Sequence, residues 1–516
     1  MRKYRWLLVF CVMLSAGFLF SAVQDTADLA MVAKIRNEGI KHSQVMHLVG
    51  YLSDVIGPRP TGSPEISRAY SWTAAKLRDW GFENVHLEPY EFGVGWTPRY
   101  VSAHLLEPYA APLIAITVEW GSSTKGKITG RPVYVDIRSQ QDFAKYRGKL
   151  GGKIVFYMPP RDTPAYYTPD AHRYDEQALK DMDSYPIPDE RPWGDDYERG
   201  FIDELEDFFR EEGVGVLVRP SSDIRRDYGT VRAFGIRSAR LKNRPRPLPE
   251  IILAAEHYNR IHRIVEVYGE PCTMEVEVRT EFFEDDLTAY NVVGEIPGTD
   301  KPDEVVMLGG HIDSWSPGTG AADNAAGCAV CMEAVRILQE LGVKPRRTIR
   351  IVLWSAEEKG WLGSKAYVAQ HFGDVETMTL KPEQARISAY FNYDNGSGRI
   401  RGIRTQGNVQ LRPIFEAWME PLRDLGMVQV INRSSMGSDH GALDLVGIPS
   451  FQWIQDPLEY MTRVHHTNMD VYDHLAPADL IQSAVVVACF VYHTAMREEM
   501  LPRKPLPDPR KYPVRR

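Results

Sequence analysis

Short apolar runs of β-strand length alternate with segments of helical length along the C-terminal half of this chain. The strand-type runs cover residues 291–296, 305–308, 348–354 and 387–393, and the helical segments cover 325–339 and 363–371. Runs that are apolar on both faces are typical of strands buried between two layers of helices. The alternation therefore predicts an α/β fold with a mainly parallel, mixed sheet flanked by helices.

Histidine and acidic residues stand at the ends of three of these runs. His311 and Asp313 follow the second run, Glu357 and Glu358 follow the third, and Asp394 follows the fourth. Side chains at the carboxyl ends of neighbouring strands converge on one crevice, where open α/β folds place their ligands. Imidazole and carboxylate groups are ligands that suit zinc. The pattern predicts a zinc hydrolase.

Six short motifs carry a resemblance to a known family. In chain order they are Gly-Gly-His-Ile-Asp-Ser-Trp at 309–315, Ala-Ala-Asp-Asn at 321–324, Ser-Ala-Glu-Glu at 355–358, Tyr-Asp-Asn-Gly-Ser-Gly at 393–398, Gly-Ser-Asp-His at 437–440 and His-His-Thr-Asn-Met-Asp at 465–470. On these motifs the sequence resembles the M28 family of co-catalytic zinc aminopeptidases, and within it the relatives of plasma glutamate carboxypeptidase. The resemblance covers most of the chain and implies the zinc-dependent exopeptidase fold.

The chain has 516 residues, which is too long for one ordinary domain. The resemblance implies a discontinuous peptidase domain at 28–120 and 283–500. Between these parts, residues 121–282 change to short β-like runs separated by Gly and Pro, and this β-rich insert resembles a protease-associated (PA) domain. Within the insert, residues 159–200 indicate a long surface excursion, and the Pro- and Arg-rich tail at 501–516 is predicted to be flexible.

The N-terminus has the layout of a secretory signal peptide. Arg2, Lys3 and Arg5 precede an apolar run from 6 to 20, and we expect residues 1–22 to be removed. An uncleaved anchor is the alternative. A signal peptide predicts a secreted protein, in the periplasm or outside the cell.

The remaining chain is predicted to be acidic and free of membrane spans. Removal of the three basic residues takes the formal net charge from −8 to −11, which disfavours nucleic acid or an anionic membrane as the partner. No interior run is expected to cross a bilayer, and 478–497 is predicted to be an amphipathic helix.

Four cysteines remain after signal removal, namely Cys272, Cys328, Cys331 and Cys489. Cys328 and Cys331 have redox-type spacing, but they lie one turn apart in an apolar helical run. Buried free thiols are the favoured interpretation, and no disulfide framework is expected.

The resemblance implies five ligands for two zinc ions per chain: His311, Asp323, Glu358, Asp394 and His466. Asp323 would bridge the two ions, Asp394 would share one ion with His311, and Glu358 would share the other with His466. Each residue type also has a common structural use, as a core histidine, a helix cap, a turn aspartate or a solvated acidic pair.

The last motif offers two adjacent histidines as the metal ligand. His465 competes with His466, and the family's His-Thr spacing fits His466-Thr467 best. Val471 stands where family members usually have Thr. Asp470 is expected to support the ligands rather than to bind metal.

Two acidic residues are predicted to take part in catalysis. Glu357 and Glu358 are adjacent, so their side chains diverge in any regular conformation. The resemblance makes Glu357 the general base, which takes a proton from a metal-activated water. Asp313 lies on the same side of an extended chain as His311 and can hold its second ring nitrogen.

The Ser438-Asp439-His440 run cannot form a nucleophilic triad, because consecutive side chains do not meet in the required way. The resemblance places this loop at the substrate pocket, so Asp439 and His440 are predicted to line or support that pocket.

Four further residues are assigned supporting positions. Asn324 is expected to support its own turn, and Asn392 and Asn395 to hold the Asp394 carboxylate. Arg59 is predicted to be a solvated turn arginine, with a contact to substrate as the alternative.

The resulting hypothesis is a secreted di-zinc exopeptidase, an aminopeptidase or dipeptidase that acts on peptides. Carboxypeptidase specificity stays open. Glutaminyl cyclases share the core fold with one zinc, but lack the insert. Transferrin-receptor-like binding proteins keep the domains but lose the metal ligands. Family relatives are often dimers, which leaves a homodimer open.

Overall fold

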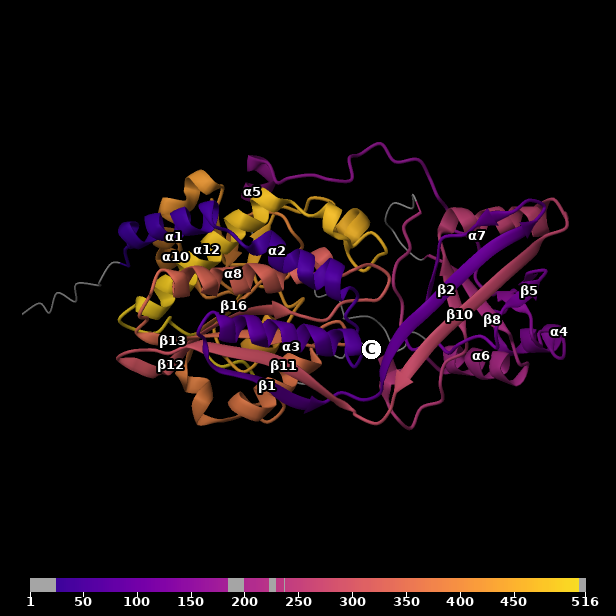
Figure 1. The fold of residues 1–516 in the computed structure, drawn as a ribbon, viewed down its shortest axis with the longest axis horizontal. Coiled ribbons are helices and arrows are strands. Elements are labelled where there is room, and N and C mark those ends of the chain that lie inside the picture. Colours follow the sequence, from indigo (N-terminus) through magenta and orange to yellow (C-terminus); the bar gives the residue numbers. More distant parts are fainter. Residues whose placement is uncertain (1–24, 184–198, 222–228, 236, 510–516) are drawn as a thin grey trace, which may run out of the picture.

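The computed structural model describes residues 25–183, 199–221, 229–235 and 237–509. The predicted signal peptide at 1–22 and the last residues of the predicted flexible tail lie outside these ranges. Figure 1 shows two lobes side by side, a larger lobe built on a broad sheet and a smaller lobe reached by two long strands, β2 and β10.

The larger lobe is built on an eight-stranded mixed sheet. Across the sheet the strands are β1 (Glu83–Glu91), β11 (Thr288–Ile296), β13 (Arg347–Trp354), β12 (Lys301–His311), β16 (Ile387–Asn392), β19 (Ser450–Gln455), β17 (Ile400–Arg404) and β18 (Gln429–Ile431). The four strands from β13 to β19 run parallel, and β1 and β11 pair antiparallel with their neighbours. Strand β17 pairs antiparallel with β19 and parallel with β18. The predicted mixed sheet with a parallel centre is therefore confirmed.

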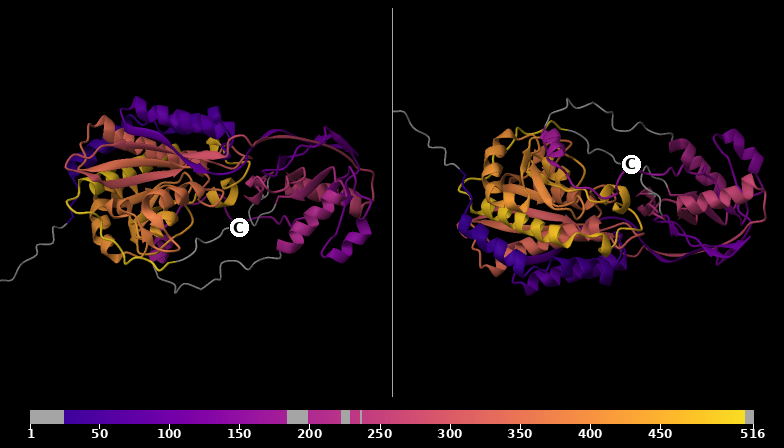
Figure 2. Two further views of the ribbon diagram at one scale, coloured as in Figure 1. Left: turned by 90° about the horizontal axis from the view of Figure 1, so that it is seen from below. Right: turned by 90° about the horizontal axis from the view of Figure 1, so that it is seen from above.

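Helices cover both faces of this sheet, because successive strand residues point to opposite faces. Val306 and Leu308 join the main core, whereas Val305 and Met307 join a second cluster on the other face. The main core includes α1 (Leu29–Lys41), α2 (Val45–Gly50), α3 (Pro64–Asp79), α8 (Ala326–Glu340), α10 (Arg412–Met419) and α12 (Pro477–Met496). The second cluster includes α9 (Leu362–Tyr367) and α11 (His440–Asp444). Figure 2 shows these layers from two further sides.

The turn at 57–63 is followed by a helix whose start has clear local causes. Pro64 occupies the first turn of α3, where its missing N–H costs nothing. The Ser63 side chain caps the helix by accepting a hydrogen bond from the Ile66 N–H at 3.2 Å.

Helix α12 differs from its prediction. It is long and apolar enough to cross a membrane by length and composition, with a mean hydropathy of 1.4, although no such interior run was expected. Of its most apolar window, 83% is buried inside the protein, where it packs against α8 and α1. It is a core helix enclosed on nearly all sides, and the amphipathic pattern predicted for it is absent because little of it meets solvent.

The smaller lobe contains two sheets. The long pair β2 (Gly95–Glu107) and β10 (Thr273–Phe283) is flanked by β3 (Ala111–Pro112) and β5 (Ile128–Gly130). The second sheet has the order β4 (Ala115–Thr117), β9 (Glu250–Leu253), β8 (Val216–Pro220), β7 (Ile154–Phe156) and β6 (Val133–Tyr134). The helices of this lobe are α4 (Phe143–Tyr146), α6 (Arg199–Glu211) and α7 (Ala255–His262). Strands β2 to β4 pair within this lobe, so it includes residues that precede the predicted insert at 121–282.

The described part of the predicted excursion at 159–200 extends from the smaller lobe to the larger lobe. Its helix α5 (Glu176–Asp183) lies on the larger lobe, as Figure 1 shows. Arg173 forms ion pairs with Asp456 at 2.9 Å and Asp479 at 2.6 Å. This segment therefore links the two lobes.

The cysteine prediction is confirmed for the described residues. Cys272, Cys328, Cys331 and Cys489 are all buried and free.

The aromatic cluster around α12 provides a stability test. Phe490 is fully buried against the rings of Phe391, Phe415, Trp418 and Trp453. We expect Phe490→Ala to lower the free energy of unfolding by about 3–5 kcal/mol, because the substitution leaves a cavity. Chemical denaturation measures the loss. Tyr167→Ala, at a position 96% exposed, is the control and should change stability by less than about 0.5 kcal/mol.

Candidate metal centre

Five polar segments meet at the carboxyl edge of the central parallel strands. His311 ends β12, Glu357 and Glu358 follow β13, and Asp394 follows β16. Asp323 lies in the turn before α8, and His466 lies in the loop beyond β19. The structure therefore brings all five predicted ligands and the predicted base to one edge, as the strand order predicts.

His311 is oriented by its neighbour. Its Nδ1 lies 2.9 Å from the main-chain oxygen of Asp313 and 3.5 Å from the carboxylate of the same residue. The backbone carbonyl, rather than the predicted carboxylate, thus makes the shorter contact and directs Nε2 into the site. The Asp313 carboxylate instead accepts a hydrogen bond from the Glu357 N–H at 3.1 Å. Asp313 therefore ties the ligand His311 to the segment that carries Glu357.

Asp323 lies between two groups of ligand atoms. Its Oδ1 is 3.1 Å from His311 Nε2, and its Oδ2 is 3.4 Å from His466 Nε2. Asp470 holds the turn behind it, because its carboxylate accepts hydrogen bonds from the N–H groups of Ala322 at 2.6 Å and Asp323 at 3.3 Å. Asp470 therefore takes the supporting position expected for it.

The remaining ligand candidates complete the two groups. Asp394 Oδ1 lies 3.3 Å from His311 Nε2 on one side. Glu358 Oε2 lies 3.1 Å from His466 Nε2 on the other side. A shared Asp323 thus joins a His311–Asp394 group to a His466–Glu358 group.

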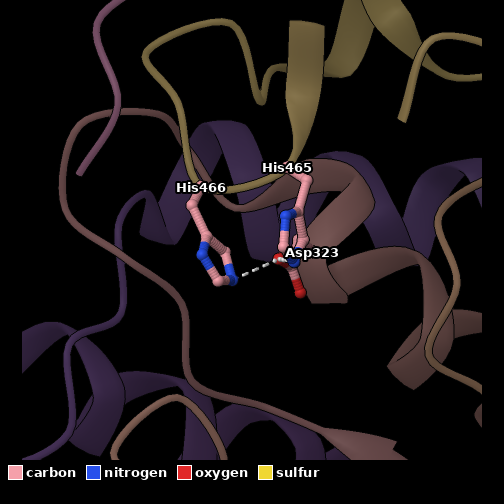
Figure 3. A group of neighbouring side chains, drawn as sticks. All are labelled: Asp323, His465 and His466. Atoms are coloured by element: carbon pink, nitrogen blue, oxygen red, sulfur yellow. Dashed lines mark ion pairs between the residues drawn. The ribbon is translucent and has the colours of Figure 1, made fainter. Parts of the chain in front are cut away.

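His465 and His466 both lie beside Asp323, at different distances. Figure 3 shows both rings beside Asp323, with the interaction drawn from His466. His465 Nε2 is farther from Asp323 Oδ2, at 3.9 Å. Its ring stacks on His466 with the centroids 3.6 Å apart. His466 lies closer to Asp323 and also faces Glu358 at 3.1 Å, whereas the ring of His465 packs on that of His466.

The spacing of these atoms fits a zinc centre. Two donors bound tetrahedrally to one zinc at about 2.1 Å lie about 3.4 Å apart, and the four contacts above measure 3.1–3.4 Å. Buried oxygens also lack hydrogen-bond partners here, including Asp323 Oδ2 and Glu358 Oε1. Imidazole and carboxylate donors without sulfur suit zinc. The residues therefore fit a zinc centre.

The electrostatics of the site point the same way. Although burial opposes a charged imidazole, the carboxylates of Asp394, Asp313 and Asp323 raise the pKa of His311 well above its usual value. Burial raises the pKa of Glu357 well above that of a free glutamate. The site holds an excess of buried negative charge, which bound cations would neutralise.

The predicted pocket residues are fully buried. Asp439 Oδ1 accepts a hydrogen bond from the Ser364 hydroxyl at 2.5 Å, and burial raises the pKa of this carboxyl to about 8. His440 Nε2 lies 2.8 Å from the main-chain oxygen of Ser435. Both side chains are buried and bonded within the protein, so they lie behind the site.

The predicted asparagine contacts are partly different. Asn324 does support its turn, because it accepts a hydrogen bond from the Gly327 N–H and donates one to the Tyr393 carbonyl. Asn392 instead donates to Ser438 and Gln452, and Asn395 donates to the Trp453 carbonyl. The prediction that these two hold Asp394 was wrong, because their amides meet β19 and the loop at 438.

The prediction for Arg59 was also wrong. This side chain is fully buried, which excludes both a solvated turn arginine and a contact with substrate. Its guanidinium donates to the carbonyls of Leu52, Gly57, Ile312, Thr319 and Gly320 at 2.7–3.0 Å. Arg59 thus fastens the His311 segment to the turn that carries Asp323. Pro58 and Pro60 on either side were the only local signal of a rigid position.

Sequence reasoning also missed an ion pair beside the site. Lys359 Nζ lies 2.7 Å from Glu119 Oε2, and both side chains are buried. Glu119 comes from the smaller lobe, directly after β4, so no local pattern links it to Lys359.

Comparison with known proteins finds similar peptidases. Residues 291–491 match the family model "Peptidase family M28". Carboxypeptidase Q from Bos taurus is 28% identical over 459 residues, which cover 88% of this chain and 85% of that protein. Carboxypeptidase Q from Homo sapiens is 26% identical over 482 residues, which cover 92% and 89%.

Solved structures share the fold. A peptidase M28 precursor from Shewanella amazonensis SB2B superimposes with a TM-score of 0.66 at 25% identity, covering 93% of this chain and 98% of that one. A Bacillus subtilis protein described as a zinc aminopeptidase gives a TM-score of 0.56 at 17% identity, covering 88% and 95%.

The fold and the cluster of histidines and carboxylates define a metallopeptidase, a hydrolase with a metal centre at the sheet edge. The match to the family model and the similarity to carboxypeptidase Q along most of the chain then place it more narrowly. The chain contains a domain of peptidase family M28, at residues 291–491. The receptor-like alternative is set aside, since the chain is a metallopeptidase.

The five carbonyls around Arg59 make a test of its structural importance. Arg59→Met keeps an apolar stem but removes every donor, and each buried group without a partner costs about 1–3 kcal/mol. We expect the free energy of unfolding to fall by at least about 3 kcal/mol in chemical denaturation. Arg68→Met, at an exposed position on α3, is the matched control and should change stability by less than about 0.5 kcal/mol. A loss below about 1 kcal/mol for Arg59→Met would contradict this account.

Proposed function

We propose that this protein is a co-catalytic di-zinc exopeptidase that hydrolyses peptide bonds near a free terminus, as an aminopeptidase or dipeptidase. The observation that carries the proposal is the position of Asp323, whose two carboxylate oxygens each face a different histidine. A carboxylate in that position can bridge two metals about 3.5–4 Å apart.

The proposed ligands divide between two ions. His311 and Asp394 hold one ion, Glu358 and His466 hold the other, and Asp323 is shared. When bound, a zinc pair lowers the pKa of a water toward neutrality and polarises the scissile carbonyl. The Bacillus subtilis protein that shares the fold is described as a zinc aminopeptidase, which supports zinc as the metal.

Glu357 is the proposed general base. Its backbone is held by Asp313, and its side chain is 8% exposed beside the ligand Glu358. The raised pKa that burial gives its carboxyl suits a group that must take a proton from water and then release it. Glu357 would give the proton to the amine that leaves when the peptide bond breaks.

Aminopeptidase and carboxypeptidase specificity differ in the end of the peptide from which residues are removed. A free α-amine is a good ligand for a second metal, which favours substrates with an unblocked N-terminus. The relatives with extensive coverage are called carboxypeptidase Q, so cleavage from the other end is tested alongside. A secreted protein is part of the proposal, on the predicted signal peptide at 1–22.

Removal of the proposed base tests the reaction. Glu357→Gln keeps the size of the side chain but cannot accept the proton, so we expect kcat to fall by about 10²–10⁴-fold. The measurement follows hydrolysis of free-amine dipeptides, N-blocked peptides and N-terminal glutaminyl peptides by metal-stripped protein to which zinc is returned. The proposal expects zinc-dependent cleavage of the free-amine substrates, with zinc still bound in the variant. Ring closure of glutaminyl peptides without hydrolysis would contradict it in favour of a cyclase.

The two adjacent histidines form a matched pair for testing the ligand assignment. His466→Ala removes a proposed ligand, so we expect one of two zinc ions per chain to be lost at micromolar free zinc. His465→Ala removes only the ring stacked on it and should retain both ions. Metal analysis of the two purified variants gives the answer. The opposite result would assign the ligand to His465.

A further inference from the structure

The smaller lobe contacts the metal centre in two ways: the Ala233 N–H donates a hydrogen bond to the His466 main-chain oxygen at 2.7 Å, and a buried acidic side chain reaches the segments beside the site. Glu119 is 1% exposed and follows β4. Its Oε2 pairs with Lys359 Nζ at 2.7 Å, and its Oε1 accepts a hydrogen bond from the Ser316 N–H at 3.0 Å. Both partners belong to the larger lobe and stand next to site residues in the sequence. Glu119 therefore contacts the two segments that carry Trp315 and Glu358.

Lys359 carries this contact onward to an indole ring. Its Nζ lies 3.4 Å from the centroid of the Trp315 ring and 5.5 Å from that of Trp120. An ammonium over an indole face is attracted by the ring, more strongly when water is excluded. Both side chains of the Glu119–Lys359 pair are buried, so the surrounding protein fixes their positions. The Lys359 ammonium thus packs on the face of the Trp315 ring and holds that ring in place.

Trp315 in turn contacts both ligands of one proposed metal. Its Nε1 donates a hydrogen bond to Glu358 Oε2 at 2.5 Å, and its ring lies 5.6 Å, centroid to centroid, from His466. The same oxygen, Oε2, faces His466 Nε2 at 3.1 Å, while Oε1 has no hydrogen-bond partner. The hydrogen bond from Trp315 therefore orients the Glu358 carboxylate beside His466.

The contact between the two lobes at Glu119 and Trp315 is closely packed. A Cβ placed on Gly235 of the smaller lobe would lie 3.0 Å from the Glu119 Cβ and 3.1 Å from the Trp315 ring. Glycine lets the lobe approach this near, whereas a larger residue at this position would require Glu119 or Trp315 to shift by a few tenths of an ångström. The main chain of Glu119 is also bonded to the Phe234 carbonyl at 2.9 Å. The smaller lobe thus sets the position of Glu119 and Trp315 together.

We propose that Glu119 is a positioning residue for the metal held by Glu358 and His466, and that it acts through Lys359 and Trp315. Through this chain of contacts, the placement of the smaller lobe controls how tightly that one ion is bound. The inference rests on the proposed di-zinc function.

The electrostatic reason is the charge of Lys359. With Glu119 in place, the ammonium is paired and lies on the ring. Without that carboxylate, a buried ammonium would have Glu358 as the adjacent acidic group, and it would compete with the metal for the same oxygens. The His311–Asp394 ion lies across Asp323 and makes no use of Trp315. The loss is therefore expected at one ion only.

The test is stepwise zinc release from the holoenzyme to a competing chelator. For Glu119→Gln we expect one of the two zinc dissociation constants to rise by about 10–100-fold, as is typical when a group behind a metal ligand is removed. The other constant should change by less than about threefold. Trp315→Phe keeps an aromatic side chain but loses the N–H donor, and it should weaken the same step.

Glu250→Gln is the matched control. Glu250 is a buried acid of the same lobe whose side chain accepts a hydrogen bond from Tyr157 at 2.6 Å. It should leave both zinc constants unchanged, whatever its effect on the melting temperature. The inference is overturned if Glu119→Gln leaves both constants unchanged, if it weakens both equally, or if Trp315→Phe has no effect on either. A wild-type protein with a single zinc equilibrium would instead refute the proposed di-zinc function, and this inference with it.

Discussion

The structure depends on keeping several carboxylates close together in a buried crevice. Five carboxylates lie around two histidines, and each is at most about one-tenth exposed: Asp313, Asp323, Glu357, Glu358 and Asp394. Like charges at such short range repel, and each carboxylate loses hydration on burial. Neighbouring carboxylates raise the pKa of His311 against the effect of burial, and burial raises the pKa of Glu357. A pair of divalent cations would relieve it, so the same feature that strains the apoprotein supplies its metal affinity.

The rest of the fold holds these groups in place against that repulsion. The Arg59 guanidinium donates to main-chain carbonyls and joins the His311 segment to the turn of Asp323. Asp470 holds the same turn through its N–H groups. The parallel strands supply the convergence, while buried contacts behind them supply the precision that a catalytic site requires. The smaller lobe adds Glu119, so both lobes contribute to one centre.

The parts that could be predicted from sequence have local signals. Buried parallel strands appear as continuous apolar runs, and His311, Glu358 and Asp394 follow such runs directly. The positions of Arg59 and Glu119 could not be predicted in this way, because their partners are distant in sequence. Glu119 meets Lys359 across 240 positions, and Arg59 bonds to carbonyls that carry no sequence signature. Helix α12 was misjudged for a related reason: its apolar surface is matched by the surrounding helices, which only the tertiary structure reveals.

The central claim is that Asp323 bridges two metal ions. Anomalous diffraction at the zinc edge, from crystals of the zinc-loaded protein, tests it directly. The account predicts two peaks about 3.5–4 Å apart, one beside His311 and Asp394 and the other beside Glu358 and His466, with Asp323 between them. A single peak, or two peaks that do not share Asp323, would contradict it.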